Sequence, residues 1–270
     1  MSLTKAKYRM LDGAFVNLDD FGADPNNILD STSAIQSAFA EARTLNKTIY
    51  GNGTYKCSSR LTLPAVSIYG NIVLDMSSVI SPVSSYVTIG DQNHTLLTTV
   101  VSTTNFNTFV VADATGIAVG DTVLLSDQTE YSWNAARASY KSGEIVEVAS
   151  ISGTSITTTK PRFDSYSSST NVYKFAENPS VVISGFSVIA SGTETVASIR
   201  FQNLKNSVVK NINISGNTYT NIQVANCYEV TFENIKAQSL HSVLSSDDYA
   251  FRIVDSQSIR CLNLDLTAPR

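Results

Sequence analysis

The chain has 270 residues, of which 43% are hydrophobic and 16% are charged, and its net charge is −4. This length permits a large core, and the absence of a basic excess argues against nucleic acid as the main partner, because phosphates require basic surface. No apolar run approaches the roughly 18 residues of a membrane span, and residues 1–13 lack the apolar centre of a signal peptide.

Cysteines and histidines are too few and too scattered for a metal centre. Cys57, Cys227 and Cys261 are far apart, and the histidines are His94 and His241. This pattern predicts neither a disulfide framework nor a zinc site, and we expect no metal and no cofactor. Cys261 is expected to be a small core residue.

The N-terminal part predicts a helix followed by short strands. Residues 1–13 are polar and are expected to form a docking or neck segment. Ser31 or Thr32 can cap a helix whose apolar face holds Ala34, Ile35, Ala38, Phe39 and Ala42. Such a helix would close the open end of a stack of strands. We therefore assign residues 14–96 to a helical cap and the first strand coils.

Three motifs in this part carry a family resemblance: Asp20-Phe21-Gly22-Ala23, the helix start Asp30-Ser31-Thr32-Ser33-Ala34-Ile35-Gln36, and Gly53-Thr54-Tyr55. They resemble the N-terminal segment of the pectate-lyase-like family, which includes many bacteriophage tailspikes and capsule depolymerases. The family usually has Gly-Asp-Gly after the Ala and two Asp before the helix, where this chain has Asp24-Pro25-Asn26-Asn27 and one Asp30. The resemblance covers residues 14–76 and implies a right-handed parallel β-helix.

Residues 97–170 differ in character. Alternating strands joined by glycine-rich turns predict a small antiparallel barrel or a set of hairpins. The segment resembles the fin-like insert of many tailspikes, which flanks the sugar groove in those proteins. Trp133 could stack on sugar rings there or could pack within the insert, and both readings stay open.

From Tyr173 to Leu266 one apolar pattern recurs four times. Ile183, Val209, Phe232 and Cys261 form one column, at intervals of 23 to 29 residues. Apolar and polar residues alternate within each row, as in strands with one buried face, and the repeat predicts stacked β-helix coils over residues 171–270.

The polar positions of these rows also form columns: Asn211, Asn234 and Asn263 at one corner, and Glu177, Asn203, Asn226 and Asp255 at another. The Asn column is expected to adopt the left-handed conformation and to stack its amides, whereas Lys210–Glu233 and Lys236–Asp265 read as cross-strand ion pairs.

The longest corner, residues 238–250, holds Asp247 and Asp248. Glycoside hydrolysis needs two carboxyl groups, so both are candidate catalytic residues, with Tyr249, Arg252 and Trp133 as candidate substrate-binding residues. Adjacent Asp side chains point to opposite sides of a strand, so a partner carboxylate could come from another coil or subunit. Alternatively, both Asp residues only shape the turn.

The resemblance implies a homotrimeric tailspike in the phage tail. Its expected partners are a bacterial capsule or O-antigen polysaccharide, which it would cleave by hydrolysis, and other tail proteins, contacted through the N-terminus. A non-catalytic adhesin and a polysaccharide lyase are the alternatives. No terminal cap follows Leu266, and solenoids normally need one, so we expect the chain to be truncated at its C-terminus.

Overall fold

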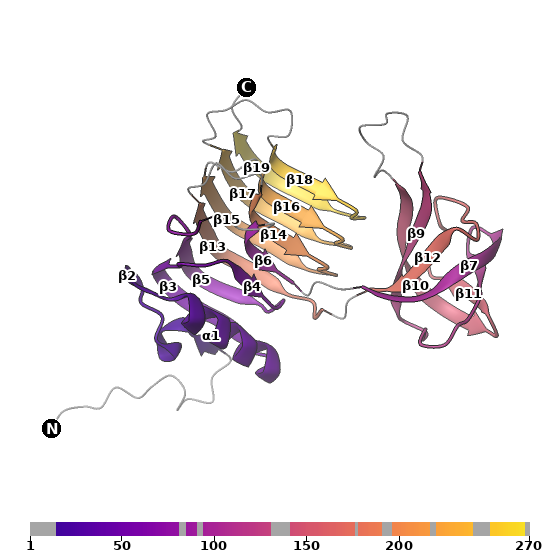
Figure 1. Ribbon diagram of the computed structural model, residues 1–270, viewed down its shortest axis with the longest axis horizontal. Coiled ribbons are helices and arrows are strands. Elements are labelled where there is room, and N and C mark those ends of the chain that lie inside the picture. Colours follow the sequence, from indigo (N-terminus) through magenta and orange to yellow (C-terminus); the bar gives the residue numbers. More distant parts are fainter. Residues whose placement is uncertain are drawn as a thin grey trace. The chain divides into compact units, whose positions relative to one another are not determined.

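The computed structural model describes residues 15–80, 85–90, 94–130, 141–175, 178–190, 196–216, 220–239 and 249–267. The chain forms two compact units: residues 1–91 with 178–270, and residues 92–177. The second unit is inserted between β6 (Ser85–Ile89) and β13 (Val182–Ala190) of the first (Figure 1). Among the described residues, no helix has the length and apolarity that crossing a membrane requires.

The first unit is built from two parallel sheets. The eight-stranded sheet has the order β1-β3-β5-β13-β15-β17-β19, with β2 beside β3. Besides β13, its strands are β1 (Phe15–Asn17), β2 (Asn26–Asp30), β3 (Thr48–Lys56), β5 (Ile68–Asp75), β15 (Val208–Gly216), β17 (Thr231–Ser239) and β19 (Arg260–Thr267). The five-stranded sheet has the order β18-β16-β14-β6-β4. Besides β6, its strands are β4 (Leu61–Leu63), β14 (Ala197–Gln202), β16 (Thr220–Ala225) and β18 (Tyr249–Val254).

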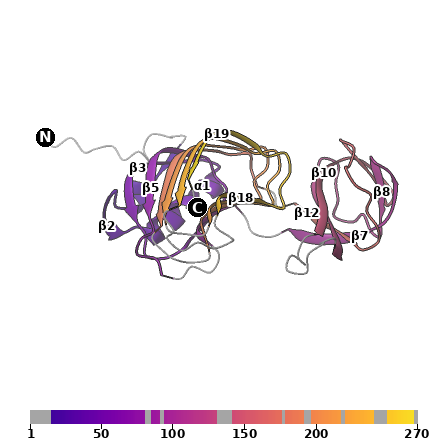
Figure 2. The same cartoon turned by 90° about the horizontal axis from the view of Figure 1, so that it is seen from above.

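Consecutive strands from β13 to β19 alternate between these two sheets, so each turn of the chain adds one strand to each sheet. Figure 2 looks along the stack, and strands of successive coils overlie one another. The predicted parallel β-helix is confirmed.

The residues of the predicted inward column are register partners in the structure. Ile183 pairs with Val209, Val209 with Phe232, and Phe232 with Cys261. All but Cys261 are buried in the main core. Cys261 lies in the outermost described coil and is exposed, so its assignment to the core was wrong. Residues on an inward face are covered only when a further coil lies on top of them.

The prediction that Tyr173 begins the first coil of the repeat was wrong. Tyr173 belongs to β12 (Thr170–Lys174), which pairs with two strands of the inserted unit. Instead, Val87 of β6 is the register partner of Ile199. The coil is thus completed by residues that precede the insertion.

One corner column holds residues with left-handed backbone in successive coils. Asn211, Asn234 and Asn263 have φ angles of 55°, 53° and 53°. The Nδ2 of Asn234 donates to Oδ1 of Asn211 at 3.2 Å, and the Nδ2 of Asn263 donates to Oδ1 of Asn234 at 3.1 Å. The predicted amide ladder is confirmed. Gly185 stands below it with φ 71°, and a Cβ there would lie 1.9 Å from the carbonyl oxygen of Gly70.

Helix α1 (Thr32–Leu45) covers the first coils, and Ile35, Ala38, Phe39 and Ala42 are buried in the main core. Ser31 is the N-cap residue, but its side chain makes no capping bond and instead accepts from the Asp24 N–H at 2.9 Å. Asp30 substitutes for it: its Oδ1 accepts from the N–H and the hydroxyl of Thr32. The short 3-10 helix η2 (Leu18–Phe21) precedes this turn.

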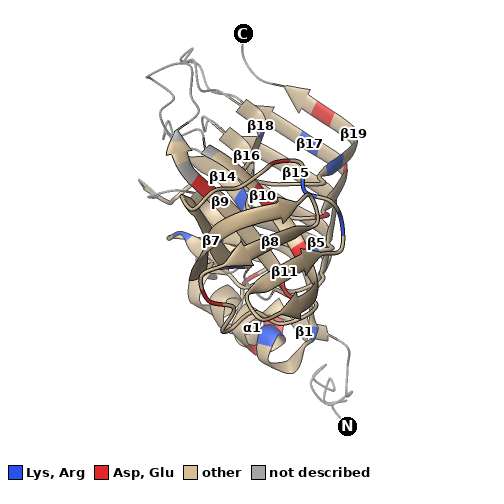
Figure 3. Ribbon diagram, turned by 90° about the vertical axis from the view of Figure 1, so that its right-hand side faces the viewer, with Lys and Arg blue, Asp and Glu red and all other residues tan. Residues whose placement is uncertain are grey.

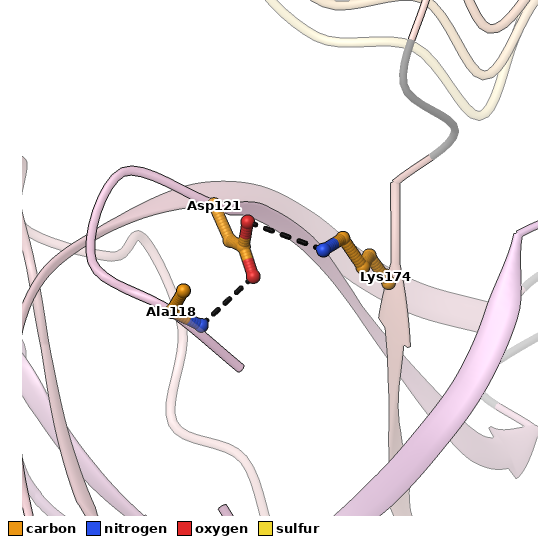
Figure 4. A network of polar contacts seen from close by, with 3 residues as sticks. All are labelled: Ala118, Asp121 and Lys174. Carbon is orange, nitrogen blue, oxygen red and sulfur yellow. Dashed lines mark hydrogen bonds and ion pairs between the residues drawn. The ribbon is translucent and has the colours of Figure 1, made fainter. Parts of the chain in front are cut away.

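The inserted unit is a closed antiparallel barrel in the order β10-β11-β8-β7-β12-β9. Besides β12, its strands are β7 (Thr95–Asn105), β8 (Thr108–Val111), β9 (Thr122–Glu130), β10 (Lys141–Ser152) and β11 (Ser155–Thr158). It has its own core, which includes Val100, Phe109, Leu125 and Val172. At one end Lys174 pairs with Asp121 at 3.4 Å, and Asp121 also accepts from the Ala118 N–H at 2.8 Å (Figure 4). Of the predicted alternatives, the barrel is the observed one.

Candidate functional site

The predicted site residues divide into two groups. Asp247, Asp248 and Trp133 lie outside the described residues. Tyr249 and Arg252 both lie in β18, the outermost described strand of the five-stranded sheet. The described part of the candidate site is therefore the outer face of this sheet.

Tyr249 and Arg252 are in contact with each other. The guanidinium carbon of Arg252 lies 5.6 Å from the centre of the Tyr249 ring, within cation–π range. Tyr249 is 40% exposed. An aromatic face and a guanidinium held side by side in water suit the apolar face and the polar groups of a sugar.

A row of side chains continues from Arg252 across the sheet. Arg252 pairs with Gln223, Gln223 with Arg200, Arg200 with Thr88, and Thr88 with Thr62. The intervening residues of each strand, such as Ile199 and Ile222, are buried in the core, so the row lies on the outward face. We call this set, Thr62, Thr88, Arg200, Gln223 and Arg252, the outer row.

Arginine dominates the charge of the outer row. Burial lowers the pKa of Arg200 below its usual value, and the nearby Arg60 lowers it further. The carboxylate of Asp255, at the adjacent corner, acts in the opposite direction. Figure 3 shows how sparse charged residues are on the strands, most of which are tan. Two arginines brought together on such a surface form a local positive site.

Sequence reasoning identified Tyr249 and Arg252 but missed Arg200 and Arg60. Arg200 was detectable, because Ile199-Arg200-Phe201 and Phe251-Arg252-Ile253 place Arg at the same position of two rows. Arg60 was not, because the insertion separates it from the repeat and only the register of β6 with β14 brings it close.

Several carboxylates of the first coils serve turns. Asp24 accepts from the N–H groups of Asn26, Ile28 and Leu29. Partial burial acts to raise the pKa of Asp75, but hydrogen bonds from Ser77 and Asn27 outweigh it and the net pKa is lowered. These carboxylates therefore stabilise turns by accepting hydrogen bonds from neighbouring residues of the chain.

The remaining predicted charge pairs lie on the other sheet. Lys236 and Asp265 are register partners with their charged atoms 4.0 Å apart, so this predicted ion pair is confirmed as a long, exposed one. Lys210 and Glu233 are register partners too. Within the described residues, no group of three or more His, Cys, Asp and Glu side chains could hold a metal ion.

Comparison with known proteins gives the class and then the family. The chain has the fold of phage tailspikes: that of gp49 from Pseudomonas phage LKA1 matches with a TM-score of 0.74, 16% identity, and coverage of 92% of this chain and 46% of that one. Gp61 of Pseudomonas phage phi297 matches with a TM-score of 0.66 and 16% identity, over 91% of this chain and 49% of that one.

A third tailspike, Gp54 of Acinetobacter baumannii bacteriophage AP22, was solved in complex with A. baumannii capsular saccharide. It matches with a TM-score of 0.61 and 17% identity, over 95% of this chain and 47% of that one. The chain thus spans about half the length of the tailspikes it matches.

The family model for rhamnogalacturonase A/epimerase, pectate lyase-like proteins matches residues 15–264. The chain belongs to this pectate-lyase-like family, as the motifs near its N-terminus predicted. Among curated protein sequences, no match is found.

Proposed function

We propose that the protein is a phage tailspike that binds and depolymerises a bacterial surface polysaccharide, either capsule or O-antigen. The observation that carries this proposal is the match of over nine-tenths of the chain to tailspikes, one of which holds a capsular saccharide. The contact of Tyr249 with Arg252 supports it, because aromatic and guanidinium groups side by side suit a sugar.

The reaction in this proposal is glycosidic hydrolysis. One carboxyl group protonates the leaving oxygen, and a second acts as base or nucleophile. Asp247 and Asp248 are the proposed catalytic residues, with a partner carboxylate from a neighbouring coil or subunit if only one of them faces the substrate. Tyr249, Arg252 and Trp133 are the proposed substrate-binding residues.

The assembly and location follow from the same proposal. The protein would act as a homotrimer in the phage tail, at the bacterial surface, with residues 1–13 docking onto other tail proteins. Light scattering of the purified protein measures the subunit number directly, and a monomer at micromolar concentration would contradict the trimer.

Release of reducing ends from purified capsular and O-antigen polysaccharides tests the activity. We expect the polysaccharide that the protein binds to shorten, and Asp247→Asn with Asp248→Asn to lower the rate by at least about 100-fold. Replacement of Asp265, which already pairs with Lys236 on the other sheet, by Asn is the matched control and should leave the rate unchanged.

Three outcomes separate the alternatives. Binding without any shortening identifies an adhesin and contradicts hydrolysis. Products that absorb in the ultraviolet identify a lyase, because elimination leaves an unsaturated sugar. Undiminished turnover in the double variant removes Asp247 and Asp248 from the mechanism.

A further inference from the structure

Two arginines lie close together on the outer face of the five-stranded sheet. Nη2 of Arg60 donates to the hydroxyl of Thr88 at 3.3 Å. Thr88 is the register partner of Arg200, and neighbouring strands are separated by about 4.8 Å. Thr88 is fully buried although it points away from the core. The guanidinium of Arg60 thus contacts a covered hydroxyl whose residue is the strand neighbour of Arg200.

Neither arginine forms an ion pair within the part of the chain that the structure describes. The Nε atoms of both Arg60 and Arg200 are buried and have no hydrogen-bond partner. Burying a charged donor without a partner is unfavourable, and two like charges add repulsion.

Arg162 in the barrel is an arginine whose guanidinium bonds extensively to the chain itself. Its Nε donates to the carbonyl of Phe106 at 3.2 Å, and its Nη2 donates to the carbonyls of Asn105 and Thr108. Its guanidinium also lies over the Phe109 ring. Arg162 ties the β7–β8 hairpin together through these bonds, although its Nη1 is buried without a partner. Among the described residues, Arg60 donates only to Thr88, and no hydrogen bond of the Arg200 guanidinium is found. Two such arginines on one face leave donors that an outside ligand can use.

The outer row extends this positive site along the stack. Gln223 follows Arg200 on the next strand, and Arg252 follows Gln223 on the strand after that. Arg200 and Arg252 are therefore two strand spacings apart, about 10 Å. The amide between them can bond sugar hydroxyl groups. Because the whole chain carries a net charge of −4, the attraction for an anion is local to this row.

We propose that Arg60 and Arg200, with Arg252 further along the outer row, form a subsite for the acidic group of a polysaccharide, a carboxylate or a phosphate. The inference rests on the proposed function and narrows it: the substrate is an acidic polysaccharide. Guanidinium groups match carboxylate and phosphate oxygens with paired hydrogen bonds, and partial burial strengthens the attraction. The ligand would supply the ion-pair partner that no described carboxylate gives to these two arginines.

Binding to matched polysaccharides tests this proposal. A panel of purified capsular and O-antigen polysaccharides is measured by calorimetry in three forms: native, carboxyl-reduced, and dephosphorylated. We expect the protein to bind an acidic member, and removal of its acidic group to weaken binding at least about tenfold. The carboxyl-reduced and dephosphorylated arms identify which acid is recognised.

The same measurement is made on Arg60→Gln combined with Arg200→Gln. We expect binding of the native acidic polysaccharide to weaken at least about tenfold, and the variant to discriminate little between native and neutralised forms. Arg260→Gln, which removes one charge from an exposed position on the other sheet, is the control and should bind as the unmodified protein does.

The outcomes are distinct. Equal binding of native and neutralised polysaccharide, or full binding by the double variant, overturns the acidic subsite and leaves the proposed function standing. Absence of binding to every polysaccharide overturns both. The melting temperature gives a second readout, because unsatisfied, mutually repelling arginines should not stabilise the fold. We expect it to stay level or rise in the double variant, and a lower value with unchanged binding would assign the arginines to the fold.

Discussion

The amide of Asn234 both accepts and donates in the ladder between Asn263 and Asn211, and its backbone is left-handed with φ 53°. This side chain therefore makes two separate contributions to the free energy of unfolding. Asn tolerates the left-handed conformation better than most residues, and its amide joins three coils. Replacing it with Ala removes both contributions, and replacing it with Gly removes only the amide.

We expect Asn234→Ala to lower the free energy of unfolding by about 2 kcal/mol, from roughly 1 kcal/mol of backbone strain and a similar loss of hydrogen bonding. Asn234→Gly should cost about half as much, because glycine adopts this conformation freely. Urea unfolding monitored by circular dichroism measures both. Equal losses in the two variants would show that backbone strain contributes nothing at this corner.

At the scale of elements, Asp30 joins the start of α1 to the turn after β3. Its carboxylate accepts from Thr32 and also from the N–H and hydroxyl of Ser58, at 2.9 Å each. Burial acts to raise its pKa, but the bonds from Thr32 and Ser58 outweigh burial, and the pKa of Asp30 is lowered. A lowered pKa means that the charged form stabilises the folded state. This contribution is present above the unfolded pKa of about 3.9 and is lost as pH falls through the folded value.

Asp30→Asn is therefore expected to destabilise the protein by about 1 kcal/mol at pH 7, the cost of losing a helix cap at a solvent-exposed site. The difference should narrow as pH falls from about 4 through the lowered pKa of folded Asp30, because the carboxylate is protonated first in the unfolded state and then in the folded state. Denaturant unfolding at pH 7 and at a pH below about 4 measures the difference in the free energy of unfolding between Asp30→Asn and the unmodified protein. Glu41→Gln, in the same helix, is the control. A difference that is constant with pH would contradict the charge-based explanation.

Much of the fold could be predicted because its elements repeat. Strand alternation gave the columns of Ile183 and Asn211 correctly, since register on a half-buried sheet is determined by which face is apolar. Tyr173 was misassigned because β12 of the barrel alternates in the same way. Period alone does not distinguish a parallel partner from an antiparallel one.

The candidate site was less predictable than the fold, because part of it is formed by pairing between segments that are far apart in the sequence. Arg252 stands in β18, directly after the long corner that the sequence marks out, whereas Arg60 acquires its neighbours only after β6 pairs with β14 across the insertion. Pairing between distant segments leaves no local signal in the sequence. The burial of Arg200 likewise depends on neighbouring coils, which single-strand patterns do not describe.

At the scale of the whole molecule, the barrel interrupts the chain but not the β-helix. Ile68 of β5 pairs with Ile183 of β13, and Val87 of β6 pairs with Ile199 of β14, so both sheets continue past the insertion. The barrel is closed and has a separate core, from Val100 to Val172. Closure leaves no unpaired sheet edge, which an isolated unit of this size would otherwise expose.

We therefore expect residues 92–177 to fold alone, and the remaining chain to keep its β-helix when a short Gly/Ser linker replaces them. Amide NMR of the isolated barrel should give dispersed signals, and its urea transition should coincide with one of two transitions of the whole protein. Leu125→Ala, in the barrel core, should shift that transition by roughly 2–5 kcal/mol and leave the other in place. Collapsed NMR signals of the excised barrel, or a single transition shifted as a whole by Leu125→Ala, would show that the two units fold as one.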